Sequence, residues 1–301
     1  FRKYFEEVEI GDSLETAGRT VTDADIVNFS NVSWDHFYAH TDSTSLNGTI
    51  FDKTVAHGYF ILSAAAGLFV SGKKGPVIAN YGLENANFFK PVYAGDTITV
   101  YLTAKERINK GVKGRNIPSG VVKWLVEVVN QREETVCVAT ILTLVAKKSP
   151  FIKIDYKDFA KRLNILTEKS VPNWGRMKAQ EMLEHLETTM KYSTGELETT
   201  ECKTPAENLE MYQDSLYNFR KMPKDFPAPF LEEGKLPELK YQNLEEAKTH
   251  FIESVKNYQI YYRENPEAEH LHFVFGTLNK EMMELFHQKH VTHHFEQFGL
   301  V

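Results

Sequence analysis

The sequence is poor in cysteine, in net positive charge and in long apolar runs. Its two cysteines, Cys137 and Cys202, are too few for a disulfide framework and lack CxxC spacing, so we expect a reducing cytoplasm. The 41 acidic residues outnumber the 35 basic ones, giving a net charge of −6, which argues against a nucleic-acid partner. The longest apolar candidate, residues 59–70, is far shorter than the ~20 residues that span a membrane. The few cysteines, the negative net charge and the lack of long apolar runs therefore argue against a secreted disulfide-rich protein, a nucleic-acid-binding protein and a membrane protein, respectively.

The composition is otherwise that of a folded globular protein, with 42% hydrophobic and 25% charged residues. A chain of 301 residues is long enough for two ordinary domains. The pattern changes at Lys147-Lys148-Ser149-Pro150, so we expect one domain over 1–150 and another over 151–301.

The first half predicts an α+β domain in which one apolar helix is wrapped by an antiparallel sheet. Thr22 and Asp25 form a capping signature before a helix through Phe29. The segment 56–69 is almost entirely apolar and small, which indicates a helix buried on most sides. β-branched and aromatic residues predict strands over 78–89, 97–107, 120–131 and 134–147.

The second half loses strand-like alternation and predicts an all-α four-helix bundle. The expected helices cover 178–192, 205–221, 244–262 and 280–299. Thr204 before Pro205 and Asn279 before the last segment are suitable caps. The proline-rich segment 222–242 is expected to be a long loop.

The most informative residues are Asp35 and His40, followed by Ala56-His57-Gly58. A carboxylate and an imidazole five residues apart can position water and transfer its proton. Gly58 opens the apolar helix, whose first free N–H groups can hold a developing oxyanion. Together these groups suit addition of water to an activated unsaturated acyl group. We assign no catalytic role to His57, whose side chain we expect to fix the helix start.

Several ordered motifs across 1–150 resemble those of MaoC-type hot-dog hydratases, and most closely those of the PaaZ branch of phenylacetate degradation. They are Asp35-x-x-x-x-His40 and the segments 55–60, 75–82 and 89–92. The resemblance implies that Asp35 and His40 are the catalytic pair and that the Gly58 amide holds the thioester oxygen. It also implies hydration of a 2-enoyl-CoA, or hydrolytic opening of an oxepin-CoA ring, without a cofactor.

The same resemblance carries expectations about assembly. A lone hot-dog sheet leaves an exposed edge that the family closes by pairing subunits, so we expect a homodimer or a higher homo-oligomer. The chain begins at Phe1 rather than Met, and the resemblance implies an aldehyde dehydrogenase domain upstream in a longer polypeptide.

Two further features bear on the CoA thioester. Many MaoC-type relatives have glycine where this chain has Trp34, so the indole is expected either to shape the acyl pocket or to pack on the sheet. Clustered basic residues predict a loop that contacts the CoA phosphates or, alternatively, a solvated hairpin. They are Lys105, Arg107, Lys110, Lys113 and Arg115.

The last predicted helix is rich in histidine. His287, His290 and His294 fall within a ~60° arc of that helix, whereas His293 points away. Spacings of three and four allow two imidazoles to share a metal. Residues 165–301 resemble a DinB-like four-helix bundle in the motifs around Trp174 to His185, at 275–278 and at 290–299. The resemblance implies a triad of His185, His290 and His294 that holds Zn²⁺ or Ni²⁺. Because only neutral imidazole binds a metal, we expect the metal to be lost on acidification through the usual histidine range.

Two other classes of function stay open at this stage. The hot-dog half could be a non-catalytic acyl-CoA-binding or scaffolding module, or the chemistry could lie in the helical half as a metal-dependent transferase or hydrolase. The histidines could also line a polar seam without metal. The acyl chain and the metal are left undetermined.

Overall fold

The computed structural model describes residues 2–111, 114, 116–224 and 238–301. The chain divides into two compact units, the first made of Phe1–Gly111 and Pro118–Lys148 and the second containing Ser149–Val301. Each unit has its own apolar core, so each is described separately.

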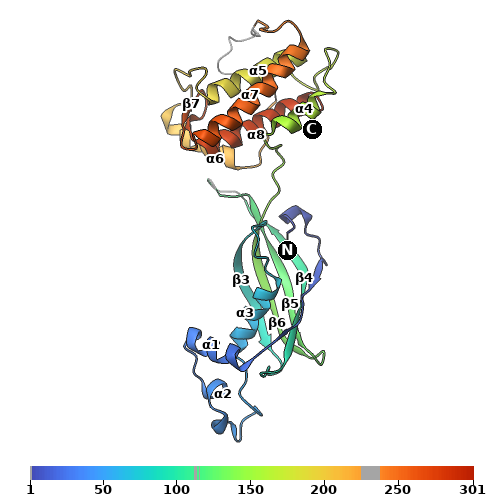
Figure 1. The fold of residues 1–301 in the computed structure, drawn as a ribbon, viewed down its shortest axis with the longest axis vertical. Coiled ribbons are helices and arrows are strands. Elements are labelled where there is room, and N and C mark those ends of the chain that lie inside the picture. The colour runs from blue at the N-terminus through green and yellow to red at the C-terminus, as the bar shows by residue number, and fades with distance from the viewer. Residues whose placement is uncertain (1, 112–113, 115, 225–237) are drawn as a thin grey trace. The chain divides into compact units, whose positions relative to one another are not determined.

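The first unit is an antiparallel sheet with one long helix across it (Figure 1). In the described part of the chain the sheet has six strands, in the order β1-β4-β5-β6-β3, with β2 also pairing β4. The strands are β1 (Ser13–Glu15), β2 (Arg19–Thr20), β3 (Val77–Phe88), β4 (Thr97–Asn109), β5 (Ser119–Asn130) and β6 (Thr135–Ala146). The four long strands are those that the sequence predicts. The two short ones were not predicted, because two or three exposed residues carry no periodic signal.

The helices of this unit are η1 (Phe5–Glu7), α1 (Asp23–Ser33), α2 (Tyr38–Thr41), η2 (Ser43–Leu46) and α3 (Gly58–Phe69). The helix α3 buries Phe60, Ile61 and Ala65 in the core formed with the inward face of the sheet, while Tyr59 is 71% exposed. The exposed residues of α3 are Tyr59, Ser63 and Gly67, which form one narrow stripe, and its other residues are buried or half-buried. The prediction that this helix is buried on most sides is therefore confirmed. The predicted fold class, a hot-dog α+β arrangement, is confirmed.

The second unit is mainly helical. Its helices are α4 (Tyr156–Leu163), α5 (Ala179–Ser193), η3 (Ala206–Asn208), α6 (Leu209–Tyr217), α7 (Leu244–Glu264) and α8 (Lys280–Gln297). The helices α5, α7 and α8 lie side by side (Figure 1), and their apolar faces share one core with Phe159 and Leu166. Asn243 and Asn279 cap α7 and α8 with side-chain oxygens, as the sequence predicts for Asn279.

Three details of this unit differ from the all-α prediction. A hairpin of β7 (His270–His272) and β8 (Gly276–Leu278) precedes α8, and its strands are too short to show alternation. The predicted helix over 205–221 is shorter and begins as a 3₁₀ turn, and α4 was not predicted. None of the helices in the described residues combines the length and apolar content needed to cross a membrane.

Candidate functional site

The end of α1 positions Asp35. A capping box between Thr22 and Asp25 starts α1, and the helix ends at Trp34, whose backbone is left-handed with φ of 64°. That turn leads directly into Asp35, and a carboxylate oxygen of Asp35 accepts the backbone N–H of Phe37 at 3.1 Å. The carboxylate is therefore held at the start of the short segment that carries His40.

His40 lies on α2 with one ring nitrogen already engaged. Its Nδ1 is 2.6 Å from the carbonyl oxygen of Val55, so Nδ1–H donates to that oxygen. This hydrogen bond leaves Nε2 as the acceptor in neutral His40, the form that can take a proton from water. Val55 lies close before Gly58 in the chain and so ties the base to the start of α3.

His57 completes a cluster with Asp35 and His40. A carboxylate oxygen of Asp35 and one ring nitrogen of each imidazole lie within 4.8 Å of one another. The rings of His40 and His57 are stacked, with centroids 3.7 Å apart and planes 24° apart. Ring-nitrogen lone pairs lie in the ring planes, so stacked imidazoles cannot both direct them well at one ion. This cluster suits acid–base chemistry better than metal binding.

Gly58 is the first residue of α3, and the first amides of a helix have no acceptor within the helix. A Cβ added to Gly58 would stand 2.8 Å from the ring of Phe88 on β3. Glycine is therefore needed for the close approach of the aromatic ring. The structure brings Asp35, His40 and Gly58 into one region, as their predicted roles require.

The structure does not bring Lys105 and Arg107 to this region. Lys105 and Arg107 lie in β4 rather than in a loop, so that part of the prediction is wrong. The Arg107 guanidinium donates to the carbonyl oxygens of Phe5 and Glu6, at 3.3 and 3.1 Å. Lys113 and Arg115 lie outside the described residues.

The strand register places Arg107 far from Gly58. Arg107 pairs with Val122 on β5, whereas Phe88, which touches Gly58, pairs with Cys137 and through it with Val128. The stretch of β5 from Val122 to Val128 spans about 20 Å. A role for Lys105 and Arg107 therefore requires a ligand that extends along the sheet.

Trp34 is 85% exposed, so it neither packs on the sheet nor lies in the apolar core. Its left-handed backbone is the conformation that glycine adopts without strain. The indole thus stands in solvent beside Asp35.

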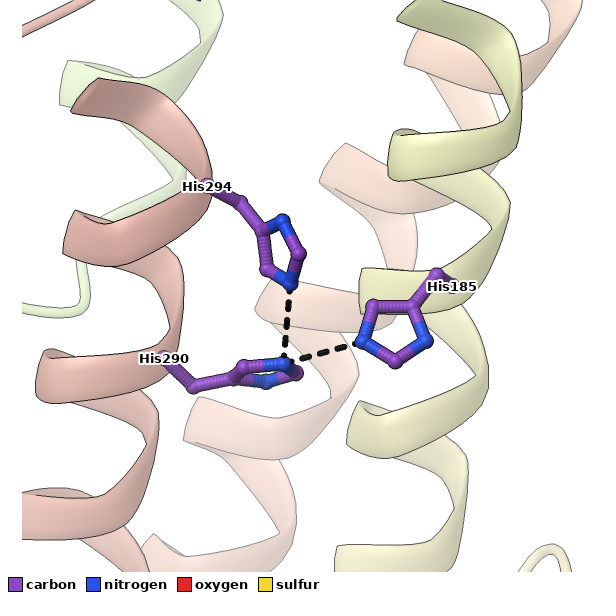
Figure 2. Close-up of side chains that lie close together, drawn as sticks. All are labelled: His185, His290 and His294. Atoms are coloured by element: carbon purple, nitrogen blue, oxygen red, sulfur yellow. Dashed lines mark hydrogen bonds between the residues drawn. The ribbon is translucent and has the colours of Figure 1, made fainter. Parts of the chain in front are cut away.

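The second cluster lies between α5 and α8. Figure 2 shows His185 from α5 facing His290 and His294 from α8. The Nε2 atom of His290 is 2.9 Å from Nε2 of His185 and 3.1 Å from Nε2 of His294. Nitrogens about 2.05 Å from a tetrahedral Zn²⁺ lie about 3.3 Å apart. The spacing of the three nitrogens therefore fits a shared metal ion.

Hydrogen bonds behind the triad support the same interpretation. His294 Nδ1–H donates to Oε1 of Gln297 at 3.0 Å, and the Gln297 amide is oriented by its own bond to the carbonyl oxygen of Trp174 at 2.7 Å. These two hydrogen bonds place the proton of His294 on Nδ1, so Nε2 carries a lone pair that is directed at His290. The Nε2 of His290 can donate to only one of its two imidazole neighbours. A cation in the middle would satisfy all three nitrogens.

Burial keeps these imidazoles neutral. It lowers the pKa of His185 to about 4, and burial together with the neighbouring histidines lowers the pKa values of His290 and His294 well below the usual range. Neutral imidazole is the form that binds metal. The triad would therefore stay in the form that can bind a metal ion down to a lower pH than the ordinary histidine range that the sequence suggested.

The other two histidines of α8 have different surroundings. His287 is fully buried and its Nε2 is 2.7 Å from Ser193 Oγ, so it belongs to the core rather than to the triad. His293 packs edge-on against Trp174. Helical spacing alone could not distinguish a core histidine from a triad histidine on α8. The difference lies in the neighbour on α5, which is Ser193 for His287 and His185 for His290.

Two family models match the chain. A MaoC like domain matches residues 6–126, and a model described as a protein of unknown function (DUF1569) matches residues 219–299. The (R)-specific enoyl-CoA hydratase of Rhodospirillum rubrum is 33% identical over 103 residues, which are 33% of this chain and 68% of that protein. The chain belongs to the MaoC-like family.

Other comparisons concern the same half of this MaoC-like chain. Protein MaoC of Klebsiella aerogenes is 59% identical over 110 residues, 36% of this chain; the match spans about a third (33%) of that protein's length. The solved structure of a monoamine oxidase regulatory protein from Archaeoglobus fulgius is 36% identical, covers 49% of this chain and 96% of its own, and has a TM-score of 0.45.

Sequence reasoning missed several residues of the two sites in the MaoC-like chain. The Val55 carbonyl and the Phe88 ring carry no motif of their own, since one is backbone and the other lies on a distant strand. Gln297 was visible within the histidine-rich ending, but its role depends on the hydrogen bond that only the fold reveals.

Proposed function

We propose that the first unit is a hydratase that adds water across the double bond of a 2-enoyl-CoA thioester. The observation that carries the proposal is the meeting of the Asp35 carboxylate and the His40 imidazole beside the helix-start amide of Gly58. Membership of the MaoC-like family and the names of the relatives support the reaction class and the CoA thioester. This reaction requires no cofactor.

The reaction follows from the positions of these groups. The Gly58 N–H donates to the thioester carbonyl oxygen and stabilises the enolate that forms when water attacks the β-carbon. Asp35 and His40 hold the water, and one of them accepts its proton as the new C–O bond forms. A proton is then delivered to the α-carbon, so one water is added and the thioester is kept. Loss of one acid–base partner costs about 100-fold or more in turnover.

The experiment is hydration of crotonyl-CoA by wild type and three variants. Asp35→Asn and His40→Ala should each lose at least ~100-fold in turnover while keeping the wild-type melting temperature. His36→Ala is the matched control, because His36 is the exposed neighbour of Asp35 and should retain activity. Full activity in both site variants would refute Asp35 and His40 as the catalytic pair. An inactive but correctly folded wild type would favour the acyl-CoA-binding module.

The acyl group is a separate question that the same assay answers. The exposed Trp34 indole beside Asp35 supports a substrate with a flat or cyclic acyl group, such as the oxepin-CoA ring of the PaaZ branch. Ring opening of an oxepin-CoA should then be faster than hydration of a linear enoyl-CoA, and Trp34→Gly should raise KM for the ring substrate only.

We propose pairing with a second copy of this chain through β3. This strand is bonded only to β6 within the described residues, and its exposed apolar side chains include Ile78, Tyr81 and Leu83. Burial of such an edge is typical of subunit interfaces.

For the second unit we propose a divalent metal centre held by His185, His290 and His294, with Zn²⁺ or Ni²⁺ as the ion. The convergence of three Nε2 atoms supports it. The ion would supply a Lewis acid with room for a further ligand, because His185 is only partly buried. This suits a metal-dependent transferase or hydrolase on a DinB-like bundle.

Metal analysis of purified protein tests the centre. Wild type and His293→Ala should retain about one ion per chain after desalting, and His290→Ala should retain none. Equal metal content in all three proteins would refute the site. Crotonyl-CoA hydration by His185→Ala separates the two units, since the hydratase proposal requires that its activity be unchanged.

A further inference from the structure

His57 contacts both members of the proposed acid–base pair, although it comes from a different part of the chain. Its ring is stacked on that of His40, with centroids 3.7 Å apart. Its Nε2 is 3.0 Å from the backbone carbonyl oxygen of Asp35. It is also the residue immediately before Gly58, at the N-cap of α3. One buried side chain therefore joins the acid, the base and the oxyanion amide.

The hydrogen bonds define which form of His57 is present. Ser30 Oγ–H donates to the carbonyl oxygen of Ile26 at 3.1 Å, so this hydroxyl can only accept from His57 Nε2, which lies 3.3 Å away. Nε2 therefore carries the proton and donates to Asp35 and, more weakly, to Ser30. Nδ1 is left as a buried lone pair without a hydrogen-bond partner.

An unsatisfied buried nitrogen is costly, so packing alone is a poor reason for a histidine at this position. A leucine would fill the space without that cost. Histidine supplies both a flat ring against His40 and a donor for the Asp35 carbonyl, whereas leucine supplies neither.

Burial favours the neutral form of His57. It is the largest influence and lowers the pKa of His57, and His40 and His36 act in the same direction, whereas the hydrogen bond to the Asp35 carbonyl and the Asp35 carboxylate raise it. A neutral ring presents a π face to His40 when His40 accepts a proton.

We propose that His57 is a positioning residue of the hydratase site, which fixes the backbone of Asp35 through Nε2–H and the plane of the His40 ring through stacking. The inference rests on the proposed hydratase function. It assigns to His57 a part in turnover that its sequence position did not suggest. Because His57 acts on the acid–base pair, its loss should lower kcat and leave KM unchanged.

The test uses three variants of the full chain. His57→Gln keeps a donor for the Asp35 carbonyl but has no ring, His57→Phe keeps a ring but has no donor, and His57→Leu has neither. In crotonyl-CoA hydration, kcat of the Gln and Phe variants should fall about fivefold to tenfold, as expected for one lost contact. In the Leu variant kcat should fall by up to about 50-fold. KM should stay within about twofold.

Ser30→Ala is the matched control, because it removes the weaker contact of His57 Nε2 and leaves Asp35 and His40 untouched. Its kcat should stay within about twofold of wild type. Melting temperatures of all variants identify a loss caused by unfolding.

Two results would overturn the positioning role. One is a His57→Leu variant with wild-type kcat; the other is a loss that appears in KM or follows the unfolded fraction. An inactive Asp35→Asn variant beside a fully active His57→Leu variant rejects this inference alone. A fully active Asp35→Asn variant rejects the proposed acid–base site and this inference with it.

Discussion

Protonation of His287 should destabilise the second unit in acid, although His287 is not one of the proposed metal ligands. Burial, with a smaller contribution from His272, lowers the pKa of His287 from 6.5 to about 3. The neutral side chain is compatible with the fold, whereas the unfolded chain takes up a proton near pH 6.5. The stability that depends on neutral His287 is therefore complete above pH 6.5 and is lost progressively as pH falls toward 3.

The size of the effect follows from the shift. At pH 4 the unfolded histidine is almost fully protonated, whereas the folded one, with a pKa of about 3, is still mostly neutral. The proton taken up on unfolding then favours the unfolded state by about 3 kcal/mol. His287→Leu removes this cost. At pH 7.5 the variant should lie within about 1 kcal/mol of wild type, because Ser193 Oγ keeps its bond to the carbonyl oxygen of Thr189 at 3.0 Å.

Urea unfolding followed by far-ultraviolet circular dichroism measures the difference, since most helical residues lie in the second unit. Between pH 7.5 and pH 4 the His287→Leu protein should lose about 3 kcal/mol less stability than wild type. The control is His36→Leu, which removes an exposed histidine and should follow the wild-type pH dependence. Parallel losses in wild type and His287→Leu would refute the reasoning.

Three further predictions follow from individual residues. Trp34→Gly should raise the free energy of unfolding of the first unit by about 1 kcal/mol, because φ of 64° is unstrained for glycine and the exposed indole contributes little; destabilisation in thermal denaturation would contradict this. Gln297→Leu should weaken Zn²⁺ binding by about 10- to 100-fold, as measured by competition with a chelator, whereas the control Gln288→Leu should not. An unchanged affinity in Gln297→Leu would show that Gln297 does not orient His294. Leu83→Lys on β3 should convert a dimer to a monomer in light scattering. The control Ile165→Lys, at a residue that is also exposed and lies outside β3, should not; a dimer in both would place the interface elsewhere.

Much of the fold could be predicted because its long elements repeat a pattern. In β4, Val100, Leu102 and Ala104 alternate with exposed or half-buried residues, so the strand was visible in the sequence. The β7–β8 hairpin was not, because three residues give no period and its position is set by packing. Boundaries were most accurate where a cap is present, as at Asn279.

The candidate sites show the same limit at the level of single side chains. Spacing on one helix grouped His287 with His290 and His294, but a buried Ser193 opposite His287 and a histidine opposite His290 give them different environments. Likewise, a helix-start histidine such as His57 has no role that spacing can define. Its role depends on tertiary contacts with Asp35, which follows α1, and with His40 on α2. Such contacts leave no signal in the local sequence.

The most direct test of the central claim is the turnover of Asp35→Asn in crotonyl-CoA hydration, compared with wild type at equal folded concentration. The substitution keeps the shape of the side chain and removes its charge. We expect the wild-type protein to hydrate the thioester and the variant to be slower by at least ~100-fold. A variant that hydrates crotonyl-CoA at the wild-type rate would contradict the assignment of the reaction to this site.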